Sequence, residues 1–284
     1  MENILEETRF TMKKYNIRAN KNLGQNFLIN EEVVKNIVGC SNIEKEDLVI
    51  EIGPGLGTLT KYLLEKAGKV ICIELDTKML QILEDRFSLY NNFELINNDV
   101  LKVDLKNIIK KEKEEGKIKN VKIVANLPYY ITTPIIMKLL EEELELESIT
   151  VMIQKEVADR LIATPGEKNT GAITYSVYYY ADSEAIMEVP NSSFIPEPEV
   201  TSKVIKLNIR KEPAVKPKDK EKMFKIIKYA FMQKRKTLLN SLTNNGVFKN
   251  KTQGTEILNS LGIKENVRPE ELTLEQFEKI SNIL

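Results

Sequence analysis

Five short apolar segments, each followed by an amphipathic stretch, constrain the fold of this chain more than any other feature. They lie at 48–52, 69–74, 93–97, 122–126 and 149–154. Such alternation is typical of βα units, in which helices connect parallel strands. Two later apolar segments, 185–189 and 203–209, flank a proline-rich stretch and are expected to complete the sheet. The sequence therefore predicts an α/β fold with a mostly parallel sheet.

The sequence on either side of these units favours helices. Near the N-terminus, Asn30 is positioned to cap a helix over 31–38. Segment 171–182 has strand propensity, but its apolar residues recur at helical spacing, so we favour a helix there. Helical patterns also follow a Pro/Lys linker late in the chain. We therefore predict a domain at 1–211 with an N-terminal helical extension, and a small all-α domain at 212–284.

The composition excludes several kinds of chemistry. The chain has no histidine, which removes the commonest general base and metal ligand. Its 42 basic residues balance 42 acidic ones, so any nucleic-acid site must rest on local clustering. Cys40 and Cys72 lack metal-ligand spacing, and we expect neither a disulfide nor a metal site. The N-terminus has no signal-peptide pattern, and no apolar run approaches the roughly 20 residues that span a bilayer, so we expect a cytoplasmic protein.

A glycine-rich loop follows the first apolar segment, in the stretch EIGPGLGTLT. Its glycines are Gly53, Gly55 and Gly57. Because glycine has no Cβ, the backbone can approach a ligand closely at the start of the next helix. A dinucleotide site prefers G-x-G-x-x-G, whereas the spacing here is G-x-G-x-G with Glu51 two residues ahead. An acid at this place disfavours phosphate and suits the cationic sulfonium and amino group of S-adenosylmethionine.

Two further acids follow the next two strands. Glu74 ends the second apolar segment, where a carboxylate can accept both hydroxyls of a ribose. Asp99 follows the third segment and can accept from an adenine amino group. Each acid alone is more often structural, but together with the glycine loop they form the pattern of class I S-adenosylmethionine methyltransferases. We therefore predict this Rossmann-like fold, with S-adenosyl-L-methionine as the cofactor and no metal.

The fourth apolar segment ends in Asn126-Leu127-Pro128-Tyr129, a form of the tetrapeptide by which methyltransferases hold an exocyclic amine. The N6 of adenine is a poor nucleophile because its lone pair is delocalised into the ring, so oxygen acceptors for its hydrogens are needed more than a strong base. The Asn126 side chain and the Leu127 carbonyl could supply them. Pro128 would stiffen the turn and Tyr129 would stack on the base. Phe194 is a candidate for the opposite face, although by periodicity it is equally a core residue.

Seven motifs occur together in one order and carry a family resemblance. They are KNLGQNFL, EIGPGLGTLT, ICIELD, NNDVLKVD, NLPYYITTPI, FIPEPEVTS and FMQKRKTLLNSL. In these motifs the chain resembles the ribosomal RNA adenine dimethyltransferase family, and most closely its bacterial small-subunit branch. The resemblance implies dimethylation of two adjacent adenosines in a hairpin near the 3′ end of 16S rRNA, within an immature small ribosomal subunit.

The resemblance also implies roles for individual residues. The cofactor contacts would be Gln25, Asn26, Leu28, Gly53, Gly55, Glu74, Asp99 and Asn126. The target amine would be held by Asn126, Leu127, Pro128 and Tyr129, with Phe194 as the opposing ring. Two positions depart from the family. Tyr130 stands where asparagine is usual, beside the catalytic tetrapeptide, and Glu199 stands where lysine is common.

Basic residues gather late in the chain. Between positions 213 and 251 there are eleven Lys/Arg against two acids, and Lys234, Arg235 and Lys236 form the densest part. Such a cluster favours contact with RNA phosphates, although a solvated lysine-rich helix would look the same. A smaller basic group lies at Lys13, Lys14, Arg18 and Lys21. We expect a monomer with no membrane partner.

Three other functions remain open from the sequence. One is a 23S rRNA adenine-N6 methyltransferase of the macrolide-resistance type, which the NLPYYITTP form and the long basic C-terminal region disfavour. Another is a mainly binding factor in small-subunit assembly, which is compatible with catalysis. A DNA adenine methyltransferase is the most distant alternative.

Overall fold

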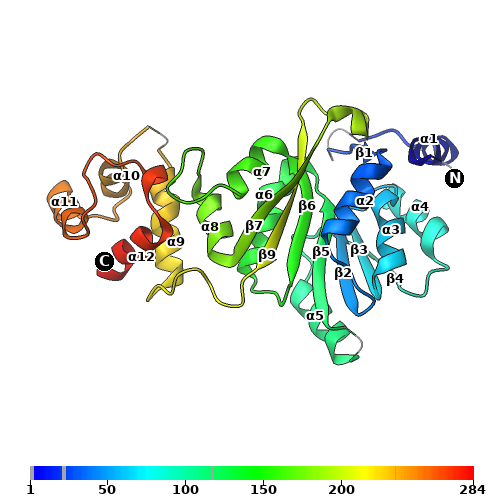
Figure 1. Cartoon of the computed structure of the whole chain (residues 1–284), viewed down its shortest axis with the longest axis horizontal. Helices are drawn as coiled ribbons and strands as arrows, with labels where there is room; N and C mark the ends of the chain where they lie inside the picture. Colours follow the sequence, from blue (N-terminus) through cyan, green and yellow to red (C-terminus); the bar gives the residue numbers. More distant parts are fainter. Residues whose placement is uncertain (1–2, 21–23, 117, 234) are drawn as a thin grey trace. The chain divides into compact units, whose positions relative to one another are not determined.

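The computed structural model describes residues 3–20, 24–116, 118–233 and 235–284 (Figure 1). Its central element is a seven-stranded sheet with strand order β4-β3-β2-β5-β6-β9-β7. The strands are β2 (Asp47–Ile52), β3 (Lys69–Glu74), β4 (Phe93–Asn97), β5 (Asn120–Asn126), β6 (Ser148–Gln154), β7 (Ala181–Val189) and β9 (Ser202–Ile209). Strands β2 to β6 pair in parallel, whereas β9 pairs antiparallel with β6. The predicted strands and the mostly parallel sheet are confirmed.

The strand order changes direction between β2 and β5. Strands β3 and β4 lie beyond β2, whereas β6 lies beyond β5 on the other side. In open α/β sheets, ligands bind beyond the carboxyl ends of the strands at such a switch point. The residues that follow β2 and β5 are therefore the first place to look for a site.

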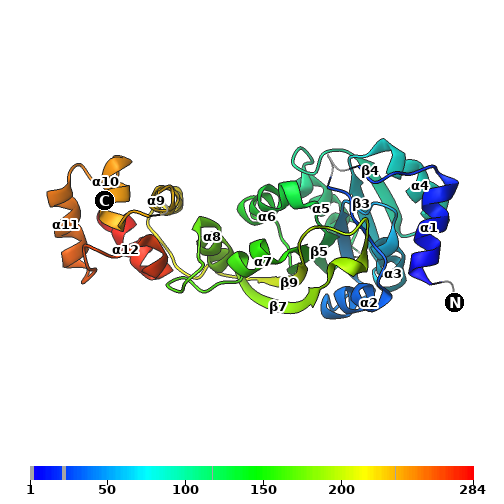
Figure 2. The same cartoon turned by 90° about the horizontal axis from the view of Figure 1, so that it is seen from above.

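Helices cover both faces of the sheet (Figure 2). On one face, α2 (Glu31–Cys40), α3 (Thr58–Lys66) and α4 (Thr77–Phe87) share a core cluster with strand residues. On the other lie α5 (Leu105–Glu114) and α6 (Thr132–Glu141). The side chain of Asn30 accepts from the backbone N–H groups of the first turn of α2, so the predicted cap is confirmed. Within the described ranges, every helix is too short or too polar to cross a membrane.

A pair of short strands joins the N-terminal segment to the end of this domain. Helix α1 (Ile4–Lys14) comes first, and β1 (Phe27–Leu28) pairs antiparallel with β8 (Phe194–Ile195). Leu28 is the register partner of Phe194, and Phe27 is that of Ile195. The remaining short elements are η2 (Tyr129–Ile131), α7 (Lys155–Leu161) and η3 (Asn191–Ser193).

The chain divides into two compact units, 1–158 with 184–209, and 159–183 with 210–284. The second unit contains α8 (Ala172–Tyr180), α9 (Lys220–Phe231), α10 (Leu238–Asn244), α11 (Lys251–Ser260), η4 (Pro269–Glu271) and α12 (Leu274–Ile283). The predicted helix at 171–182 is confirmed as α8.

The segment 159–183 packs with the C-terminal helices, although the sequence predicted it to belong to the N-terminal domain. The cause is Tyr175, whose ring lies edge-on to Phe277 at 5.1 Å between centroids. Its hydroxyl donates to the carbonyls of Pro269 and Leu272, at 3.1 and 2.7 Å. Because these partners lie about a hundred residues further along the chain, local patterns do not reveal them.

Candidate active site

A pocket opens at the carboxyl ends of the strands, where the sheet topology places it. It encloses about 1030 Å³ of empty space, part of which is open to solvent. Its lining comes from the loop before β1, the loop after β2, the end of β3, the turn after β4 and the end of β5. These residues include Gln25, Asn26, Phe27, Leu28, Glu51, Gly53, Gly55, Glu74, Asn98, Asp99, Asn126, Leu127, Pro128, Tyr129 and Tyr130.

The structure gives the three glycines of the loop two roles. Gly53 and Gly55 line the pocket and have left-handed φ angles of 67° and 56°, which favour glycine. Gly57 also has a left-handed φ angle, of 80°, and in addition it is closely packed, since a Cβ there would lie 2.4 Å from the Phe87 ring. All three glycines thus allow the backbone of the loop to turn sharply, and Gly57 also lets the loop pack closely on α4.

Glu51 and Glu74 are buried acids on the pocket wall. Glu51 is 2% exposed and accepts from the Thr60 hydroxyl at 2.6 Å. Burial raises the pKa of Glu51 to about 7. Glu74 accepts from the backbone N–H groups of Asp76 at 2.8 Å and Gly55 at 3.2 Å. These hydrogen bonds join the glycine loop to the end of β3 through one carboxylate. Burial raises the pKa of Glu74, and the same hydrogen bonds oppose that effect.

The third strand-end acid and the loop before β1 complete this side of the pocket. Asp99 lies in the turn after β4 and accepts from the Leu101 N–H at 3.0 Å. Gln25 is fixed by donating to the Asp76 carboxylate at 2.8 Å. Asn26 and Leu28 line the same side of the pocket. The eight side chains and glycines expected to contact the cofactor all line one cavity.

The Asn-Leu-Pro-Tyr segment forms another wall. Asn126 ends β5, and its side-chain nitrogen donates to the Asn26 carbonyl at 3.3 Å. This bond leaves the side-chain oxygen of Asn126 to accept from a bound group. Leu127 donates its backbone N–H to the Met152 carbonyl at 3.1 Å. The Tyr129 hydroxyl forms a hydrogen bond with that of Ser202 at 2.6 Å, which fixes the ring in the wall.

Phe194 does not present its ring as the sequence led us to expect. It is 1% exposed and belongs to the core cluster. It is not one of the described residues that line the pocket. The cause is the pairing of β8 with β1, which sets Phe194 opposite Leu28. Phe194 is therefore a core residue in this structure, which is the alternative that its periodicity had left open.

Sequence reasoning missed two aromatic residues at the pocket. Phe27 lies so close to the loop that a Cβ on Gly55 would stand 3.4 Å from its ring. Tyr130, noted only as a departure from the family, lines the pocket with 53% of its surface exposed. The other departure, Glu199, is exposed and is not among the described lining residues. The available signal was that Phe27 lies within KNLGQNFL and that Tyr130 directly follows NLPY.

The predicted RNA-contacting residues belong to the second unit. Arg235 and Lys236 are exposed in the turn between α9 and α10, whereas Lys234 lies outside the described residues. Three other lysines, at 222, 225 and 249, line a groove that also includes Tyr229 and Gln253. The Lys225 ammonium lies 5.8 Å from the centre of the Tyr229 ring. Among the described residues, no group of His, Cys, Asp or Glu is placed to hold a metal ion.

The fold is that of class I methyltransferases, the class predicted from the glycine loop, and S-adenosyl-L-methionine is the cofactor of that class. The buried acids Glu51 and Glu74, the glycine loop and the hydrogen-bond acceptors at the end of β5 fit this cofactor. Within the class, the chain belongs to the ribosomal RNA adenine dimethylase family, whose model matches residues 16–284. The family resemblance drawn from the seven motifs is confirmed.

Individual relatives agree with this family. A ribosomal RNA small subunit methyltransferase A from Alkaliphilus metalliredigens is 48% identical over 271 residues, covering 95% of this chain and 93% of the relative. One from Clostridioides difficile is 45% identical over 277 residues, covering 98% and 94%. A solved dimethyladenosine transferase from Plasmodium falciparum has a TM-score of 0.72 and 28% identity, covering 89% and 95%. The 23S rRNA methyltransferase ErmE, at 22% identity and a TM-score of 0.68 over 90% and 98%, shows the fold alone.

Proposed function

We propose that this chain transfers methyl groups from S-adenosylmethionine to N6 of two adjacent adenosines in a hairpin near the 3′ end of 16S rRNA. The substrate is the RNA of an immature small ribosomal subunit. One observation carries the proposal: the glycine loop and the Asn126–Tyr129 segment face a single pocket. The near full-length relatives named as small-subunit methyltransferases support this RNA over that of the large subunit.

The target end of the site would work by accepting hydrogen bonds. The side-chain oxygen of Asn126 and the carbonyl of Leu127 would each accept a hydrogen bond from the adenine amine. These bonds draw the hydrogens out of the ring plane and make the nitrogen lone pair available for attack. Tyr129, fixed through Ser202, stacks on the base with about 1–3 kcal/mol. The product amine is cationic and loses its proton readily, which suits a chain without histidine.

The cofactor end would orient the methyl donor. When bound, S-adenosylmethionine supplies the methyl group. Glu74 would accept from the ribose hydroxyls, Asp99 would accept from the adenine amine, and Gly53 and Gly55 would allow close backbone contact. Asn26 and Leu28 close the side of the pocket, with Gln25 held beside them by Asp76.

The second unit would hold the RNA backbone. Arg235 and Lys236, with Lys234, remain the predicted contacts, and the lysine-lined groove beside Tyr229 offers the same chemistry. Lysine and arginine neutralise phosphates whatever the base sequence, so these residues are expected to position the subunit rather than to select the adenosines. We expect the protein to act as a monomer in the cytoplasm, where bacterial ribosomal subunits are assembled.

Methyl transfer from labelled cofactor to purified ribosomal subunits tests this proposal. Small subunits lacking the modification are expected to gain label on two adjacent adenosines, located by mapping of the modified bases. Label only in large-subunit RNA would overturn the substrate assignment, and reduced macrolide susceptibility on expression would point the same way. A protein that binds the subunits without any transfer would point to an assembly factor instead.

A further inference from the structure

Helix α1 lies outside the part of the chain that the family model matches, because that match begins at residue 16. The match to the family model therefore assigns no role to this helix. Its N-terminus is capped by Asn3, whose side chain accepts from the Leu5 N–H at 3.1 Å. One acid of this helix, Glu7, has ion-pair partners on two other helices, α3 and α4.

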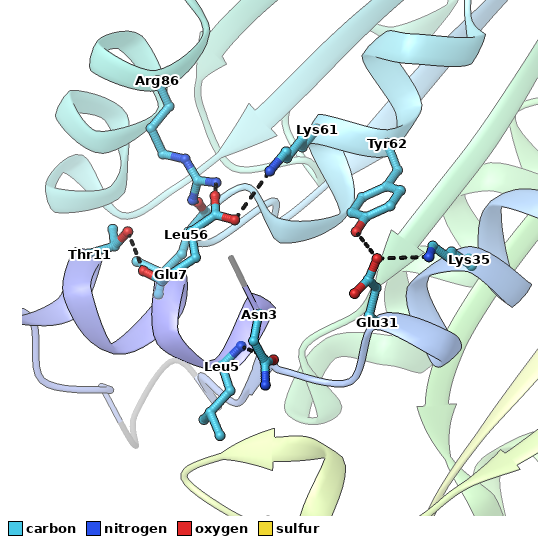
Figure 3. Close-up of polar contacts among 10 residues, drawn as sticks. All are labelled: Asn3, Leu5, Glu7, Thr11, Glu31, Lys35, Leu56, Lys61, Tyr62 and Arg86. Atoms are coloured by element: carbon cyan, nitrogen blue, oxygen red, sulfur yellow. Dashed lines mark hydrogen bonds and ion pairs between the residues drawn. The ribbon is translucent and has the colours of Figure 1, made fainter. Parts of the chain in front are cut away.

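Figure 3 shows Glu7 between two cations that come from different helices. Its carboxylate forms an ion pair with Arg86 of α4 and accepts from the Lys61 ammonium of α3 at 3.2 Å. Lys61 lies in the first turn of α3, directly after the glycine loop. A second contact joins α1 to α4, since the Tyr15 hydroxyl donates to Asp85 at 2.8 Å.

Arg86 extends this network to the glycine loop itself. Its side chain is 17% exposed, and it donates from one nitrogen to the Leu56 carbonyl and from another to Glu7. Leu56 lies between Gly55 and Gly57 and lines the pocket. A guanidinium is a rigid planar fork, so fixing one side of it on Glu7 orients the side that holds the loop carbonyl.

We propose that Glu7 and Arg86 form a clamp through which helix α1 holds the glycine loop in its cofactor-binding shape. Arg86 is a positioning residue, since it contacts the loop from behind and not the pocket itself: among the described lining residues, Leu56 is present and Arg86 is absent. The proposal rests on the proposed function, in that the loop is taken to bind S-adenosylmethionine.

The electrostatics explain why Glu7 is required. Burial lowers the pKa of Arg86, and the nearby charge of Glu7 opposes that effect. Without the carboxylate, a largely buried cation would lack its partner and would turn towards water. Because the same guanidinium holds Leu56, that movement would release the loop carbonyl and allow the loop to change shape.

Glu7→Gln tests the clamp in the full-length protein, with S-adenosylhomocysteine as the probe and calorimetry as the measurement. We expect its dissociation constant to rise about five- to tenfold, within the range of coupling between linked sites. In methyl-transfer assays, KM for S-adenosylmethionine should rise while kcat changes little. Glu6→Gln is the matched control, because it removes the same charge from an exposed side chain of the same helix and should leave binding unchanged.

Two further variants keep the test decisive. Arg86→Lys retains the charge but cannot bridge Leu56 and Glu7, so it should weaken binding as Glu7→Gln does. The double variant should bind no more weakly than Arg86→Lys alone, because Glu7 acts through Arg86. A lower Tm for Glu7→Gln with unchanged affinity and KM would overturn the clamp. If the unaltered protein fails to bind the probe, the proposed function fails instead.

Discussion

The two ends of the pocket are built from different kinds of backbone. At the cofactor end, Gly53 and Glu74 directly follow or end strands β2 and β3, and Glu74 accepts two backbone N–H groups. At the proposed target end, only Asn126 belongs to a strand, while Tyr129 lies in the short helix η2. Glu74 is buried, whereas Asn126 and Tyr129 are partly exposed.

This difference separates two tasks. A small cofactor enters a site whose shape the sheet and its loops already fix, which limits the entropy lost on binding. A base that has left its stack needs room and an open edge, since it remains attached to a large RNA. We infer that the cofactor end is preformed and that the target end depends on a few side chains, so variants at the two ends should affect different quantities.

The largest expected effect is that of Asn126→Ala on chemistry at the target end. Removing an acceptor that acts on developing charge commonly costs about 100- to 1,000-fold in rate. We expect single-turnover methylation of small subunits to fall by that factor. Subunit binding should change little, because we propose that the lysines and arginines of the second unit supply the phosphate contacts.

Asn126→Asp is the matched control for this variant. It keeps an oxygen acceptor and loses the donor to the Asn26 carbonyl, so it should retain more activity than the alanine variant. If the two variants are equally inactive while S-adenosylhomocysteine still binds both, an acceptor at this position is not what drives the reaction.

The next effect concerns Glu51 at the cofactor end, and it appears in stability. The pKa of Glu51 is about 7 in the folded protein, above its ordinary value of 4.5, because burial disfavours the charged form. The folded state therefore binds more protons than the unfolded state between these values. The free energy of unfolding must then fall as pH rises from about 4.5 to 7, by on the order of 3 kcal/mol for this group.

Glu51→Gln should remove that dependence. Its amide oxygen can still accept from Thr60, and no charge is buried at high pH. Urea unfolding at pH 5 and pH 8 measures the difference: the variant should gain stability relative to the parent at pH 8 and much less at pH 5. Equal differences at both pH values would show that Glu51 is already charged in the fold at pH 5.

Which features could be predicted from the sequence depends on how local their causes are. That Gly53, Glu74 and Asn126 lie together could be predicted because each follows or ends a strand, and parallel strands bring such positions to one edge. The sequence could not decide between a pocket and a core position for Phe194, because its burial depends on pairing with β1, more than 160 residues earlier. The contact between Glu7 and Arg86 joins residues separated by 79 positions, and charge patterns carry no signal over that distance.

Tyr130 was noticed from the sequence only as a departure, yet the structure places its ring at the pocket.

The smallest expected effect, that of Tyr130→Asn, tests whether this ring belongs to the cofactor end or to the target end. The Tyr130 ring lines the same pocket as Asp99 and Glu74. Burial raises the pKa of Tyr130, and the charges of these two acids add to that effect. If the ring covers the bound nucleoside, S-adenosylhomocysteine should bind about fivefold more weakly to the variant, the effect of losing roughly 1 kcal/mol of stacking. Tyr130→Phe keeps the ring and should bind as the parent does. A change in KM for the small subunit with no change in cofactor affinity would instead assign Tyr130 to the target end, and the boundary between the two ends would then run between Asp99 and Tyr130.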